Sequence, residues 1–132
     1  MSGDADTAEN HQLINLVVPQ GTLPAATAFY GTTLGLTPRT VPVLQTGRLA
    51  WFDIGSSGQQ VHVSLGRDFD FQDEAMSSGR HPCFRVESLE KLAELQRRVF
   101  SHFERGGEGA PVACDVPGGE NSGMDDLFGV GF

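Results

Sequence analysis

Residues 80–89 read Arg-His-Pro-Cys-Phe-Arg-Val-Glu-Ser-Leu, and they open the second copy of a pattern that the chain has already built once. A short alternating segment runs into Ser88 and then into a strongly amphipathic stretch, which predicts a strand, a tight turn and a helix. Residues 13–23 follow the same plan. Self-similarity of this kind predicts two related halves, each made of a strand, a helix and further strands.

The size and charge of the chain limit what it can be. Its 132 residues suffice for one core but not for two independent ones. We expect residues 1–10 to form a flexible tail and residues 11–132 a single domain, with modules at about 11–66 and 80–132. The net charge of −8 argues against nucleic acid or an anionic membrane as partner, because both need a basic face. An acidic surface that keeps the protein soluble is the simpler explanation of this charge, and attraction of a cationic or metal-bound ligand is the functional one.

The N-terminal residues, the apolar runs and the cysteines indicate the cellular compartment of the protein. Residues 1–10 have neither the apolar core nor the basic flank of a signal peptide, and no apolar run is long enough to span a membrane. Cys83 and Cys114 lie in apolar segments, outside any metal-ligand spacing, which favours reduced thiols in the core. We therefore expect a cytoplasmic protein.

The first half is predicted to hold one helix and several strands. Residues 25–34 form the helix, and Gly35 suits its C-cap, where positive φ is needed. The strands are expected at 13–18, at 37–43 as an edge or bulged strand because of its prolines, at 48–54 and at 59–65. In the last of these, Val61 and Val63 lie on one face and His62 on the other.

The second half repeats this order. Residues 81–86 alternate as a strand, residues 88–105 carry apolar side chains at helical spacing, and residues 111–116 are predicted to form another short strand. His102 lies next to the apolar stripe of that helix and is expected at the surface. Residues 127–132 read as the start of a strand that has no following partner.

The two alternating strands suggest a site. Each has an apolar back that can pack on a helix and a front with a histidine, His62 in one and His81 in the other. If both fronts face one hollow, the two imidazoles are natural ligands for a divalent transition metal. Taken without any family, a simply solvated strand face is the better explanation, because Gln60 and Ser64 flank His62.

Three short stretches resemble a known family. They are Ala-Phe-Tyr at 28–30 followed by Leu-Gly-Leu at 34–36, Gln-Val-His-Val at 60–63, and His-Pro-Cys-Phe-Arg-Val at 81–86. Together they resemble the vicinal oxygen chelate superfamily, which includes glyoxalase I, extradiol dioxygenases and bleomycin-resistance proteins. The resemblance implies an α+β fold in which two βαβββ modules form a curved mixed sheet around a cleft. The last strand of the second module is missing from the sequence.

The resemblance also implies metal ligands on the first and last strands of each module. It assigns His62 and His81 to this role. The ligand position of the first strand falls on Leu13, which cannot bind metal, while His11 and Asn15 share its strand parity, so His11 is the substitute after a register shift. The usual carboxylate ligand of the final strand has no counterpart.

Further residues are candidates for contacting a ligand. Trp51 and Asp53 share the histidine side of the sheet if their strand follows the parity of its neighbour, and Arg85 beside His81 can bind an anionic group. The structural alternatives are a core tryptophan and a surface arginine. No catalytic residue is assigned.

These observations predict a glyoxalase- or dioxygenase-like protein that binds a small molecule in a cleft. With a divalent metal (Zn, Ni, Fe or Mn) chelating vicinal substrate oxygens, it would be a lyase, an isomerase or a dioxygenase. The alternatives are a metal-free binding protein of the bleomycin-resistance type, which the acidic charge favours, and an inactive shortened paralogue. An uncovered sheet edge further predicts either a homodimer that covers it or a poorly ordered segment from about Pro117 onward.

Overall fold

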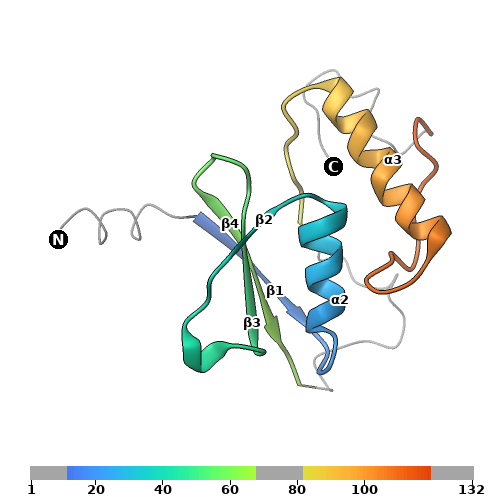
Figure 1. The fold of residues 1–132 in the computed structure, drawn as a ribbon. Helices are drawn as coiled ribbons and strands as arrows, with labels where there is room; N and C mark the ends of the chain where they lie inside the picture. The colour runs from blue at the N-terminus through green and yellow to red at the C-terminus, as the bar shows by residue number, and fades with distance from the viewer. Residues whose placement is uncertain (1–11, 68–81, 120–132) are drawn as a thin grey trace. The chain divides into compact units, whose positions relative to one another are not determined.

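The computed structural model describes residues 12–67 and 82–119 (Figure 1). The chain divides into two compact units, Met1–Phe71 and Gln72–Phe132. The first contains β1 (Gln12–Val18), α2 (Leu23–Thr27), η1 (Ala28–Thr33), β2 (Thr37–Arg39), η2 (Val43–Gln45), β3 (Leu49–Asp53) and β4 (Gln59–Leu65), and the second contains α3 (Leu89–Arg105). This combination of strands and helices confirms the predicted α+β class.

The strands of the first unit form one mixed sheet. Its four strands lie in the order β1-β4-β3-β2. β1 runs parallel to β4, whereas β4 and β3, and β3 and β2, are antiparallel. A parallel neighbour requires a crossover, and here the chain crosses through the helix before it returns along β2, β3 and β4. The first half is therefore a βαβββ module, as predicted, and Pro38 lies in the edge strand β2, where its missing N–H is tolerated.

The helix of this module changes its hydrogen-bonding pattern along its length. Pro24 lies in its first turn, where the lack of an N–H costs little. From Ala28 onward the helix is a π-helix, and the N–H of Leu34 donates to the carbonyl of Phe29 at 2.8 Å. Gly35 then ends the helix with φ of 76°, the left-handed conformation predicted for it.

The core of the first unit lies between this helix and one face of the sheet (Figure 1). Phe52 on β3 and Val61 and Val63 on β4 are fully or almost fully buried there. The Tyr30 ring lies 6.3 Å from that of Phe52, and a Cβ at Gly31 would meet the Phe52 ring at 3.4 Å, so a larger residue would press on this ring. Alternation along β3 and β4 therefore sends the intervening residues to the opposite face.

The second unit is built on α3, which matches the predicted helix. Ser88 caps its N-terminus by accepting a hydrogen bond from the Lys91 N–H at 3.1 Å, and Gly106 ends it with φ of 71°. The buried side of the helix carries Leu92, Gln96, Val99 and His102.

The burial of His102 differs from the prediction. This residue was expected at the surface, but only 4% of it is exposed. Its Nε2 lies 3.0 Å from the carbonyl oxygen of Glu108, to which it donates, because the chain folds back after the glycines that end α3. The helical spacing alone does not show this covering loop.

Two predicted strands of the second unit are not formed in the part of the chain that the structure describes. Within 82–86 only Arg85 takes part in a strand bridge, and residues 111–116 have no strand. Pro82 and Pro111 lack the N–H that a ladder needs, which is a physical reason for this difference. Cys83 is exposed and Cys114 half-buried, both as free thiols, so the expectation of a core position is wrong for Cys83. The segment 127–132 lies outside the described residues.

Among the helices of residues 12–67 and 82–119, none is long and apolar enough to cross a membrane.

Candidate functional site: a polar sheet face

The face of the sheet opposite the helix carries most of the polar side chains of the strands. Strand pairing arranges this face in rows that run across the sheet. We call it the polar face; its members are Leu13, Asn15 and Val17 of β1, Gln60, His62 and Ser64 of β4, Leu49, Trp51 and Asp53 of β3, and Thr37 and Arg39 of β2.

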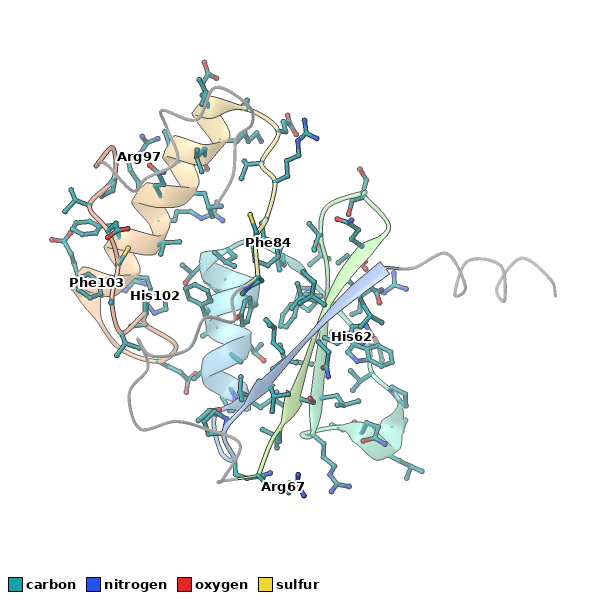
Figure 2. All side chains as sticks on the ribbon, turned by 180° about the vertical axis from the view of Figure 1, so that it is seen from behind. His62, Arg67, Phe84, Arg97, His102 and Phe103 are labelled. Carbon is teal, nitrogen blue, oxygen red and sulfur yellow. The ribbon has the colours of Figure 1, made fainter. Side chains whose placement is uncertain are left out.

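Trp51 and His62 form the centre of the polar face. They are direct cross-strand partners, and their rings stack with centroids 4.7 Å apart and an angle of 15° between planes. Figure 2 shows His62 on the sheet, on the side away from α2. Both residues are half-buried. Cross-strand aromatic pairs of this kind fix both rings, since each limits the rotamers of the other.

A chain of hydrogen bonds joins His62 to Asp53. The Nε2 of His62 lies 2.9 Å from the Oε1 of Gln60, and the Nε2 of Gln60 donates to the Oδ1 of Asp53 at 3.0 Å. Arg39 extends this chain by donating from Nη1 to the Oδ2 of Asp53 at 3.3 Å. Both carboxylate oxygens of Asp53 therefore accept hydrogen bonds from side chains of neighbouring strands.

The residues joined by these hydrogen bonds differ in how far they are exposed to solvent. Gln60 is only 7% exposed, so its amide depends on these two partners. The ion pair at the other end is open to water, with side-chain exposures of 53% for Arg39 and 26% for Asp53. An exposed pair contributes about 0–1 kcal/mol, so its main effect here is to orient the Asp53 carboxylate.

The β1 side of the polar face combines apolar and polar groups. Ser64 donates to the Oδ1 of Asn15 at a long 3.4 Å. Leu13 and Val17 are 52% and 47% exposed, which is high for side chains of their size. This side can therefore offer both apolar area and hydrogen-bonding groups to a ligand.

The structure brings three of the predicted site residues together. Trp51, Asp53 and His62 share the polar face, as the parity argument requires. Arg85 lies exposed in the second unit. His11 and His81, the other two predicted metal ligands, lie outside the described residues.

The described side chains of the polar face supply few donors to a metal ion. Within residues 12–67 and 82–119 no three His, Cys, Asp or Glu side chains form a group that could hold a metal. Among the described residues, His62 is the only imidazole of the polar face, and the oxygens of Asp53 already accept bonds from Gln60 and Arg39. The metal site predicted from the sequence thus remains a prediction.

Two residues of the hydrogen-bonded chain were not predicted as site residues. Gln60 shares strand parity with His62, two positions away, and this spacing could have indicated it. Arg39 follows Pro38 in the short strand β2, and its position beside Trp51 depends on a register that the sequence does not specify.

The pKa values of two groups away from the polar face are shifted. Burial raises the pKa of Tyr30, which packs on the helix side of the sheet. Burial, and then the negative charge of Asp115, raise the pKa of the Cys114 thiol. Neither group lies on the polar face, and a raised pKa keeps both protonated at neutral pH.

Comparison with known proteins bears on the fold. No model of a protein family matches this chain, and no curated protein matches it. Among solved structures, the chain is similar to a Bacillus anthracis protein provisionally described as a glyoxalase family protein. The TM-score is 0.52 and the sequence identity 23%, over 70% of this chain and 69% of that one. The chain therefore has a glyoxalase-like fold.

Proposed function

We propose that this glyoxalase-like protein binds a small molecule on the polar face of its first unit. The observation that supports this most is the stacked Trp51–His62 pair, joined through Gln60 to Asp53. A half-buried aromatic pair beside oriented polar groups is the usual composition of a small-molecule site.

The polar face suggests how a ligand would be held. Trp51 would supply apolar contact area, His62 a hydrogen bond, and the exposed Leu13 and Val17 an apolar margin. Asp53 would act mainly by orienting Gln60, because both of its oxygens already accept hydrogen bonds. We retain Arg85 as a proposed contact for an anionic ligand group, with no position relative to the polar face assigned.

A second candidate function is metal-dependent chemistry, as a lyase, an isomerase or a dioxygenase. The observation that favours it is the hydrogen bond from His62 to Gln60, because metal-binding histidines commonly donate their other N–H to an acceptor. In this proposal His62, His81 and His11 hold a divalent ion (Zn, Ni, Fe or Mn). When bound, such an ion would polarise vicinal oxygens of a substrate. The metal-free alternative is a ligand-sequestering protein of the bleomycin-resistance type.

A fluorescence screen tests the binding proposal. Trp51 is the single tryptophan of the chain, so its emission reports directly on the polar face. Compounds that change this emission should bind His62→Gln protein at least tenfold more weakly, and Arg97→Gln protein, altered at an exposed position on α3, as well as the native protein. Equal affinity for the native and His62→Gln proteins would contradict binding at this face.

Metal analysis separates the two candidates. Protein purified from metal-replete medium should carry about one divalent ion per chain if the metal-dependent function is right, and His62→Gln should lower this content.

We also propose a cytoplasmic homodimer. Sedimentation of the purified chain checks its oligomeric state, and a monomer at all concentrations would contradict it.

A further inference from the structure

One row of the polar face crosses all four strands of the sheet. Arg39 lies directly opposite Trp51, which lies opposite His62, and His62 in turn lies opposite Asn15. Residues that lie opposite each other in an antiparallel pair have Cβ atoms about 4.5–5.5 Å apart. A molecule of the size of one aromatic ring can therefore contact Arg39 and Trp51 together.

The hydrogen-bond acceptors along this row are already engaged by the protein. The Oδ1 of Asp53 accepts from Gln60, and its Oδ2 accepts from Arg39. The Oδ1 of Asn15 accepts from Ser64. A ligand that approaches with donor groups therefore has to share or displace contacts that exist without it, which reduces the free energy it gains.

The hydrogen-bond donors of the same row are open to a ligand. Among the described residues, Arg39 donates a single side-chain bond, to Asp53 at 3.3 Å, and its side chain is 53% exposed. A guanidinium has five N–H donors in a planar fork, so further donors remain for an anionic group. Within residues 12–67 and 82–119, no group accepts from the indole N–H of Trp51. No buried side-chain nitrogen of these residues lacks a partner, so this N–H reaches solvent.

The local charge also favours an anionic ligand. The whole chain has a net charge of −8, but residues 12–67 contain three arginines and a single acidic residue, Asp53. The charge of Asp53 is offset by its ion pair with Arg39. The acidic composition of the chain therefore does not extend to the described part of the polar face.

We propose that the polar face selects a small molecule that carries a carboxylate or a similar anionic oxygen group, and that Arg39 determines this specificity. The anionic oxygens accept from the guanidinium of Arg39 and from the indole N–H of Trp51, while the apolar part of the ligand lies against the Trp51 ring. A cationic ligand does not fit, because it would meet the exposed guanidinium. This ligand class rests on the proposed function, since it requires the polar face to be the binding site.

Three probes of similar shape test this preference. Benzoate, benzamide and benzamidine are anionic, neutral and cationic, respectively, at pH 7. Each is titrated into the ¹⁵N-labelled full chain, and the signals of the Trp51 indole N–H and the Arg39 Nε–H are followed. Benzoate should shift both signals and bind about fivefold more tightly than benzamide, as an exposed pair of opposite charges allows, and benzamidine should bind most weakly. Benzamidine binding as tightly as benzoate would overturn the proposal.

Two arginine variants separate a local contact from an effect of overall charge. Arg39→Gln should weaken benzoate about fivefold and leave the affinity for benzamide unchanged, which also shows that the face remains intact. Arg48→Gln removes the same charge from an exposed residue just before β3, with the opposite strand parity to Trp51, and should leave both affinities unchanged. Equal affinity of the native and Arg39→Gln proteins for benzoate would refute the role of Arg39.

The remaining outcomes distinguish this proposal from the proposed function. Equal binding of all three probes at the Trp51 indole N–H would reject the preference for anions but leave small-molecule binding at the polar face intact. If none of the probes shifts the indole N–H, the preference for anions is rejected, while the fluorescence screen decides separately whether the polar face binds other compounds.

Discussion

Replacing Gln60 by Met should destabilise the first unit by about 1–2 kcal/mol. The change deletes one hydrogen bond to the ionised Asp53 and one from His62, at 3.0 and 2.9 Å. A bond to a charged group contributes about 1.5–3 kcal/mol and a neutral one about 0.5–1.5 kcal/mol. Water can replace part of this loss, because the side chain of Asp53 is 26% exposed, and Met keeps most of the apolar packing.

Urea unfolding followed by the emission of Trp51 measures this effect. With a slope of about 1–3 kcal/mol per M, a loss of this size lowers the urea midpoint by roughly 0.3–2 M. The matched control is Ser64→Ala, which removes one contact of 3.4 Å and should change stability by less than about 0.5 kcal/mol. If both variants have the same midpoint, the Asp53–Gln60–His62 chain is not formed in solution and the account of the site fails.

Three further predictions concern other parts of the chain. Phe52→Ala should cost about 3–5 kcal/mol in urea unfolding, because Phe52 is 1% exposed; a loss below 1 kcal/mol would mean that the helix does not cover this ring. Burial raises the pKa of Tyr30, the single tyrosine, above its usual 10.0, so an ultraviolet absorbance titration should give a midpoint above that value, and a lower one contradicts the burial. The folded state holds this proton more tightly, so the stability contributed by the neutral phenol is complete below pH 10.0 and is lost as the pH rises above it. Iodoacetamide should alkylate the exposed Cys83 several-fold faster than Cys114, whose raised pKa leaves less thiolate, and equal rates would refute this.

The sequence was sufficient to predict the first module because its signals are local. Alternation in residues 59–65 separated Val61 from His62, and that separation is seen in the structure. The order of strand, helix and three strands followed from turns and periodicity. Gly35 marked the end of the helix through its need for positive φ.

The connections within the site were harder to predict because they depend on register. Gln60 meets Asp53, and Trp51 meets His62, only because β3 and β4 pair at one particular offset. A shift of one residue would have turned Trp51 toward the helix. The sequence pattern defines which residues share a face of one strand. It does not define which residues on two neighbouring strands lie opposite each other.

The errors in the second unit have a different origin. Residues 82–86 and 111–116 alternate like strands, yet a strand also needs a partner with free N–H and C=O groups, which alternation does not reveal. The burial of His102 depends on a loop that returns to the helix after Gly106. The spacing of apolar residues along a helix does not indicate whether a loop from elsewhere in the sequence covers one of its side chains.

The most direct test of the central claim is to locate a bound small molecule by NMR. A compound selected in the Trp51 fluorescence screen is titrated into the ¹⁵N-labelled full chain. The account predicts that the indole N–H of Trp51 and the amides of Asp53, Gln60 and His62 show the largest shift changes, while the amides of α2, on the other face of the same sheet, change least. If the largest changes fall in α2, or if the indole N–H does not move at saturation, the polar face is not the binding site.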